Sequence, residues 1–433
     1  MIFTLMIVVF VVGYLLIALE HPIKVDKAAS ALIIGGLTWA LFAFTGINHQ
    51  DLTYEIQHHL VDIAEILFFL LGAMTIVELV DAHNGFSIIT NKITTNKKIY
   101  LIWILSTITF FFSAILDNLT TSIVMAALIT KLIKDKQTLW LFAGVIILSA
   151  NAGGAWSPIG DITTIMLWIG GQVSAVNVIS SVLIPSIVCA VVPLIYLTFR
   201  LKGEIERPEL EELKEDKNNV TTSFERNLIF SLGVLGLLFV PAFKIITHLP
   251  PYVGMIFSLG VLWFVTEIIH RNKNNEEKSQ LSVIGVLKKI DTATIFFFLG
   301  ILLAVAGLQS AGHLDIVATY LDTTFNGQTT KGIYIINLVI GLLSSIVDNV
   351  PLVAGAMGMY PIAESGLYAM DGKFWEFLAY CAGTGGSVLI IGSAAGVAVM
   401  GIIKIDFIWY LKNISILALM GYIAGAATYI LMQ

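Results

Sequence analysis

Two short segments far apart in the chain each place an aspartate next to an asparagine inside apolar sequence. SAILDN ends in Asp117 and Asn118, and SSIVDN ends in Asp348 and Asn349. An ionised side chain inside a bilayer costs at least roughly 2.5–3.5 kcal/mol, so two of them at matching positions indicate a use. We expect both aspartates to bind a cation or a proton, with an asparagine carbonyl beside each. The alternative is that each aspartate caps the helix that follows it, and the two roles are compatible.

A third carboxylate lies in SANAGGAWSPIGDITTIMLW, residues 149–168. Its glycines and proline interrupt a helix, which frees backbone carbonyls and allows close approach of a ligand. Hard cations prefer sites built from oxygen donors. The oxygen donors gathered here are Asn151, Ser157, Asp161, Thr163 and Thr164. A kinked packing helix capped by Asp161 is the alternative.

A related glycine-rich segment lies in the second half of the chain. There Gly383 stands where the first half has Asn151, and Ser393 where it has Asp161, so the third carboxylate exists only once. Ser387 is a supporting candidate in this segment.

Glu65, in an apolar run, is a candidate proton-relay group or an interfacial carboxylate. His58 and His59 are expected in an outer loop.

The composition sets the fold class. Hydrophobic residues make up 57% of the 433 residues and charged residues 12%, against roughly 45–50% and about 25% in soluble domains. A soluble protein this apolar could not cover its surface, which excludes a soluble enzyme, a nucleic-acid-binding protein and a disordered scaffold. We predict an all-α polytopic membrane protein in the lipid bilayer. Cys189 and Cys381 lie in apolar runs, and we expect no disulfide, resident metal or cofactor.

About ten segments have the length of roughly 20 apolar residues that a membrane span requires. Two further segments, each with two apolar arms around an Asp-Asn tip, are predicted to be re-entrant hairpins at 99–134 and 332–361. With this topology and the N-terminus outside, all but three of the 24 lysines and arginines face the cytoplasm, as the positive-inside rule requires. We therefore expect both termini outside a cell inner (plasma) membrane. The predicted spans are 2–19, 28–45, 61–80, 177–199, 228–246, 252–269, 291–309 and 406–431, with broken helices at 138–171 and 374–403.

Three sequence blocks recur in the same order and at near-constant spacing. FFFSAILDN resembles GLLSSIVDN, ANAGGAWSPIG resembles AGTGGSVLIIG, and DIAEILFFLLG resembles DTATIFFFLG. We predict two repeats, 1–199 and 227–433, joined by a charged cytoplasmic linker at 200–226. Five spans and one hairpin per repeat make the second repeat inverted, which is typical of secondary transporters.

A mechanism follows from buried carboxylates. Desolvation disfavours their charged form, so near neutral pH such a group can hold either a proton or a metal cation. Competition for one site, combined with alternating access, suffices for cation/proton exchange. The sequence has no GxxxxGK[ST] motif for nucleotide-driven transport.

Over nearly its whole length the chain resembles NhaD-type sodium/proton antiporters of the ion transporter superfamily. The resemblance rests on SAILDNLTTSIVM, SANAGGAWSPIGDITTIMLW and SSIVDNVPLVAGAMGM. It implies exchange of Na⁺ or Li⁺ for H⁺, activity favoured at alkaline pH, and a homodimer with a scaffold part and a mobile part carrying both hairpins. It implies Na⁺ contacts at Asp117, Asp161 and Asp348, functional positions at Asn118, Asn151, Thr163, Thr164, Asn349 and Glu65, and supporting positions at Ser113 and Ser344.

Other functions are compatible with parts of this pattern. A sodium-coupled carboxylate transporter or an oxyanion permease could share the architecture, but an anion needs neutral or positive tips, and neither tip nor break contains Lys or Arg. An intramembrane aspartyl protease would need glycine where this chain has Pro158. The inverted repeat argues against a passive channel, because it favours alternating access over an open pore.

Overall fold

The computed structural model describes residues 1–90, 93, 95–206 and 221–433, and this part of the chain is helical, without a β-strand. Eight of the described helices are long and apolar enough to cross a membrane. The composition-based prediction of an all-α polytopic membrane protein is therefore confirmed. The eight are α4 (His49–Ala82), α6 (Lys98–Leu116), α8 (Lys136–Ala155), α10 (Ala175–Arg200), α11 (Ser223–Thr247), α12 (Pro251–Ile269), α15 (Thr292–Ser310) and α22 (Ser415–Met432).

Shorter helices complete the fold. The figure of about ten crossings stays a prediction, since α1 and α3 are apolar but have only 17 residues each. The shorter apolar helices are α1 (Ile2–Ala18), α3 (Lys27–Ala43), α7 (Asn118–Leu132), α9 (Ile162–Ile169), α17 (Thr330–Leu343), α18 (Asn349–Met359), α19 (Lys373–Gly385) and α20 (Ala394–Ile403). The remaining elements are α2 (Glu20–Ile23), α5 (Ser87–Thr90), η2 (His270–Asn272), α13 (Asn275–Leu281), α14 (Val283–Leu287), α16 (His313–Phe325) and α21 (Phe407–Asn413).

The outer helices present apolar side chains to their surroundings. In the most apolar stretch of α11 only 22% of residues are buried, and in α12 only 28%, against 89% in α8. Leu235, Ile246, Phe257 and Phe264 are among the large exposed side chains of α11 and α12. Exposure of so large an apolar surface to water would be unfavourable, whereas lipid tails are themselves apolar and can cover it.

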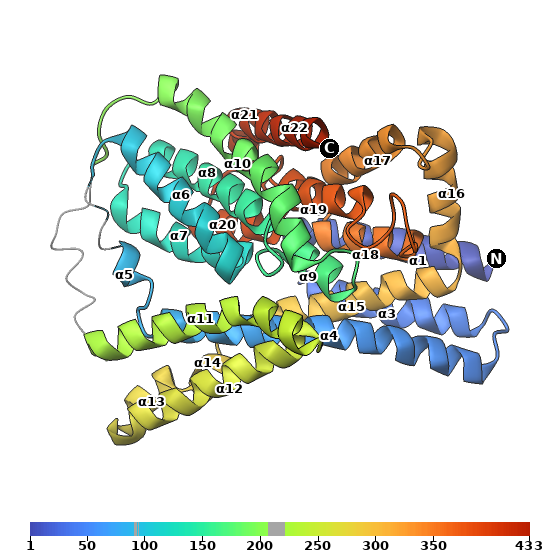
Figure 1. Ribbon diagram of the computed structural model, residues 1–433, viewed down its shortest axis with the longest axis horizontal. Helices are drawn as coiled ribbons and strands as arrows, with labels where there is room; N and C mark the ends of the chain where they lie inside the picture. Colours follow the sequence, from blue (N-terminus) through green and yellow to red (C-terminus); the bar gives the residue numbers. More distant parts are fainter. Residues whose placement is uncertain (91–92, 94, 207–220) are drawn as a thin grey trace.

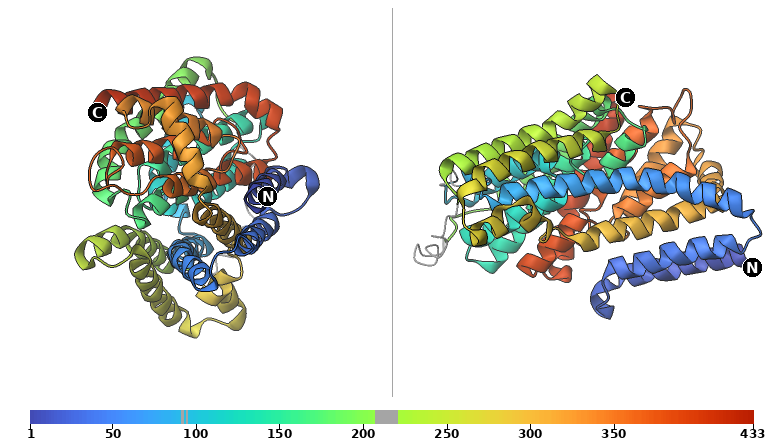
Figure 2. Two further views of the ribbon diagram at one scale, coloured as in Figure 1. Left: turned by 90° about the vertical axis from the view of Figure 1, so that its right-hand side faces the viewer. Right: turned by 90° about the horizontal axis from the view of Figure 1, so that it is seen from below.

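The helices form two groups that pack against each other (Figures 1 and 2). The first, which we call the long-helix group, consists of α1, α3, α4, α11, α12 and α15. Its most extensive contacts are those of α3 with α15, of α1 with α3 and of α11 with α12. The second, the hairpin group, contains α6–α10 and α17–α22, held together by α10 with α22 and α6 with α8. Contacts of α15 with α18 and of α4 with α9 join the two groups.

Three details of the predicted elements were wrong. The helix expected at 61–80 begins at His49, with Asn48 capping it, so His58 and His59 lie within α4 and not in a loop. The span expected at 406–431 is two helices, because α21 ends at Asn413 and α22 starts at Ser415, and α20 meets α21 at a 117° bend. Helix α16, whose sequence mixes polar and apolar residues, was not predicted at all.

Candidate functional site

The first Asp-Asn tip lies where α6 meets α7. Asp117 separates the two helices and has a positive φ of 110°. Its carboxylate accepts hydrogen bonds from the Thr120 backbone N–H (2.7 Å) and the Thr120 hydroxyl (2.8 Å). Asp117 thus caps α7, which leaves lone pairs on both carboxylate oxygens for a further ligand.

The broken segment places the third carboxylate at another helix start. Between α8 and α9 the chain leaves the helical conformation, and Asp161, only 1% exposed, caps α9. One of its oxygens accepts from the Thr163 backbone N–H (2.8 Å) and from the Thr163 hydroxyl (2.5 Å). Thr164, in the same turn, donates to the backbone oxygen of Ala155 (3.2 Å). The N-terminal end of α9 carries a partial positive charge, which favours a carboxylate there.

Tip and broken segment meet in one hydrogen-bonded cluster. The Asn118 side-chain amide donates to the other oxygen of Asp161 and to Asn151 Oδ1 (3.1 Å). The Asn151 amide in turn donates to the hydroxyls of Ser387 and Ser393, each at 2.9 Å. Residues from α7, α8, α9 and the second break are therefore linked in a buried chain of oxygen and nitrogen atoms, whose oxygens are the donors that a hard cation prefers.

Of the four predicted supporting serines, Ser387 belongs to the cluster through its bond from Asn151, and the other three bind backbone. Ser113 donates to the Ala150 carbonyl (2.5 Å), Ser157 to the Ala114 carbonyl (2.5 Å), and Ser344 to the carbonyls of Gly341 (2.7 Å) and Ala382 (3.3 Å). The bonds to Ala150, Ala114 and Ala382 fasten each hairpin to the broken segment beside it, whereas the bond from Ser344 to Gly341 lies within the hairpin arm. Their role in the structure is positional.

Glycines make the close approach of hairpin and break possible in both halves. A Cβ on Gly160 would lie 2.7 Å from the Ser113 carbonyl oxygen, and one on Gly392 would lie 2.5 Å from the Ser345 carbonyl oxygen. A Cβ on Gly153 or Gly385 would likewise collide with a backbone carbonyl of the neighbouring hairpin arm. The same contact thus recurs at corresponding positions of the two related sequence blocks.

The second Asp-Asn tip has a different environment. Asp348 caps α18 by accepting from the Val350 N–H (3.1 Å), and Asn349 is buried beside it. Lys27, at the start of α3, places its ammonium 3.7 Å from the Asp348 carboxylate. No lysine or arginine in the described part of the chain forms an ion pair with Asp117 or Asp161. Asp161 nevertheless lies close enough to Asp117 and Asp348 for their charges to interact.

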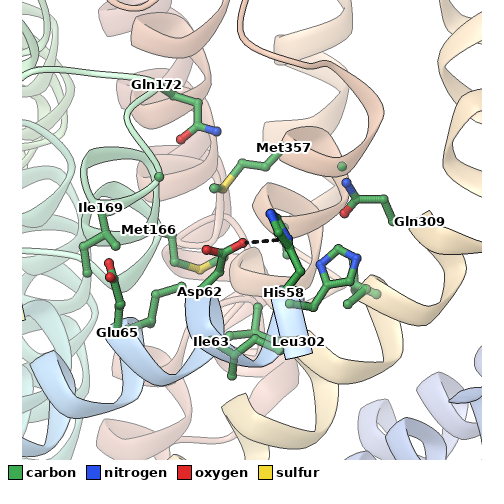
Figure 3. Close-up of a pocket in the computed structure, with 17 residues that line it drawn as sticks. His58, Asp62, Ile63, Glu65, Met166, Ile169, Gln172, Leu302, Gln309 and Met357 are labelled. Carbon is green, nitrogen blue, oxygen red and sulfur yellow. Dashed lines mark ion pairs between the residues drawn. The ribbon is translucent and has the colours of Figure 1, made fainter. Parts of the chain in front are cut away.

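Glu65 stands apart from this cluster. It lines a cavity of about 260 Å³ between the two helix groups, together with residues of α4, α9, α15 and α18. Figure 3 shows Glu65 and Asp62 projecting from α4 toward Met166 and Ile169, with His58 paired to Asp62. The cavity lining includes none of Asp117, Asp161 and Asp348.

Sequence reasoning missed the role of Lys27 and left that of Ser393 open. Lys27 was counted only as a cytoplasmic charge, and nothing near it in the sequence signals its partner. Ser393 was noted as the counterpart of Asp161, but its bond to Asn151 joins the two halves of the chain, which no local pattern reveals. The glycines of the second break were the sequence feature that could have indicated that this segment contributes to the site.

Comparison with known proteins shows to which family this chain belongs. A family model described as citrate transporter matches residues 14–375. Sodium/proton antiporter 1 of Arabidopsis thaliana is 44% identical, covering 98% of this chain and 72% of the relative. Sodium/proton antiporter 2 of the same plant is 41% identical over 98% of each chain. The chain belongs to the citrate transporter family of the ion transporter superfamily.

Bacterial members of this family resemble the chain over a similar range. The Na⁺/H⁺ antiporter NhaD of Vibrio cholerae is 30% identical, covering 99% of this chain and 91% of the relative. The expected resemblance to NhaD-type proteins is confirmed. As a member of a transporter family with several apolar spans, the chain is a multi-pass membrane transport protein.

Proposed function

We propose that this transporter exchanges Na⁺ for H⁺ across the membrane by alternating access, with Li⁺ as a second cation. The observation that carries the proposal is the buried Asp161 carboxylate, which is tied to Asn118 and Thr163 and has no basic partner among the described residues. The antiporter names of the similar proteins support it.

The chemistry rests on charge compensation. A carboxylate taken out of water needs a counter-charge, which a proton or a small cation can supply in turn. In our proposal Na⁺ replaces the proton between Asp161 and Asp117, with Asn118, Asn151 and hydroxyl oxygens completing its shell. The pair of carboxylates then carries the same net charge on both legs of the cycle, and the two cargoes move in opposite directions. Glu65, in its separate cavity, would pass protons to or from the solvent.

Further parts of the proposal rest on the resemblance and on the charge distribution of the sequence. They are a homodimer, a location in the cell inner (plasma) membrane, and both termini outside. Light scattering of the purified protein in detergent measures the first, and accessibility of an epitope at each terminus in intact cells measures the last.

The test uses everted vesicles from an antiporter-deficient strain with an acidic interior and a pH-sensitive dye. At pH 7 to 9, NaCl or LiCl should dequench the dye, whereas KCl and citrate should not. The Asp117→Asn and Asp161→Asn variants should lose the response. Asp51→Asn, which changes an exposed carboxylate in the first turn of α4, is the matched control and should retain it.

The family model's name favours one rival, a citrate transporter. Uptake of labelled citrate that depends on Na⁺, with no proton movement on adding Na⁺, would replace the proposal by that rival. The aspartates would then bind only the coupling ion.

A further inference from the structure

The ion pair of Lys27 and Asp348 connects the two helix groups. Lys27 is the first residue of α3 in the long-helix group, and Asp348 lies at the tip between α17 and α18 in the hairpin group. The two charged atoms are 3.7 Å apart, and both side chains are largely buried, at 19% and 15% exposure. The Lys27 ammonium also lies 4.4 Å from the centre of the Phe297 ring of α15.

The low exposure of both side chains and the nearby aromatic ring distinguish this contact from a surface ion pair. Two charges that are shielded from water interact more strongly than exposed ones, and an aromatic face adds attraction for the ammonium. Lys27 contacts Phe297 within its own group, so a contact independent of the tip also positions its head group. The contact is therefore between a cation of one group and a tip carboxylate of the other.

The two Asp-Asn tips consequently differ in charge. Asp117 is held by Thr120 and has no basic partner in the part of the chain that the structure describes, whereas Asp348 has an ammonium beside it. An ammonium and a sodium ion carry the same charge and compete for the same carboxylate. In this conformation the cation beside the Asp348 carboxylate is the ammonium of Lys27.

We propose that Lys27 is the internal counter-cation of Asp348: it balances the charge of this carboxylate, withholds it from Na⁺, and ties the second tip to α3 in this conformation. The inference rests on the proposed cation exchange and refines it, because it restricts Na⁺ binding here to Asp117 and Asp161. Lys27 acts through Asp348 and is a positioning residue.

The test is a double-mutant cycle on transport. Lys27→Gln should lower the apparent KM for Na⁺ by about fivefold, the effect of one partly buried charge pair, because Asp348 becomes available to the cation. Lys27→Arg, which keeps the charge, should restore the original value. In the Asp348→Asn background the Lys27→Gln change should have little further effect. Lys24→Gln, an exposed lysine three residues earlier, is the matched control.

A second readout does not depend on transport. The thermal unfolding temperature of the four proteins of the cycle, purified in detergent, should show that the two single changes are not additive. Additive effects in both readouts, or a Lys27→Gln protein that behaves like Lys24→Gln, would overturn the inference. Coupling in unfolding with no antiport in the unmodified protein would keep the ion pair and reject the proposed exchange.

Discussion

Gly160 leaves no room for a side chain where the first hairpin meets the broken segment. A Cβ there would lie 2.7 Å from the Ser113 carbonyl oxygen and 2.9 Å from the Ala114 Cα, whereas ordinary contact begins at 3.4 Å. Gly160→Ala must therefore displace backbone by about 0.7 Å, the difference between 3.4 and 2.7 Å. Both neighbours are backbone atoms within a helix and cannot rotate away. Overpacking of this kind costs about 1–3 kcal/mol.

The same displacement reaches the site, because Gly160 precedes Asp161. A misplacement of ~1 Å in a binding constellation can reduce a rate by about 100-fold, so antiport by Gly160→Ala should fall by at least tenfold while the protein still folds. Gly260→Ala is the matched control: a Cβ on this exposed glycine within α12 would have nothing within 4 Å of it, and helix propensity favours alanine there by roughly 0.5–1 kcal/mol. Thermal unfolding in detergent and the vesicle assay measure the two effects. Equal unfolding temperatures and equal antiport for both variants would refute the close-packing argument.

Three further predictions concern single side chains. Asp135→Ala removes the α8 cap on the Thr138 N–H (2.8 Å) and should cost about 1 kcal/mol of stability. Because the hydrogen bonds from Thr138 lower the Asp135 pKa, the difference in stability from the unmodified protein should shrink as the pH falls below about 4. Unfolding curves at pH 3 to 7 would measure this difference. Burial lowers the pKa of His83, just beyond α4, so protonation favours unfolding, and the unfolding temperature should fall as the pH drops below about 6.5; a His83→Gln protein with the same pH dependence would contradict this. Asn118→Ala removes the donor to Asp161 and should cost about 1–3 kcal/mol. Because Asn118 is also a proposed Na⁺ ligand, NaCl should stabilise this variant less than it stabilises the unmodified protein, which unfolding in NaCl and in choline chloride measures.

The elements that sequence reasoning predicted well are those set by local pattern. Apolar runs of sufficient length gave α10, α11, α12 and α15 to within a few residues, since a bilayer span has a fixed length. The tips at Asp117 and Asp348 and the break before Asp161 were also visible, because each puts a capping or helix-breaking residue inside an apolar run.

What sequence reasoning missed depends on contacts between distant segments. The polar first turns of α4 do not look like a membrane span, yet the helix continues through His58 and His59. Lys27 and Asp348 belong to different helix groups, and Asn151 reaches Ser387 and Ser393 across the two halves. Such pairings are set by the packing of whole helices and leave no periodic trace in the sequence.

The central claim is that Na⁺ and a proton compete for the carboxylates of Asp117 and Asp161. Its most direct test is proton release by the purified protein in a weakly buffered detergent solution, followed with a pH indicator as NaCl is added near neutral pH. The account predicts release of protons on Na⁺ binding, no release with choline chloride, and loss of the signal in Asp161→Asn but not in Asp51→Asn. Binding of Na⁺, measured by calorimetry, without any release of protons would contradict it.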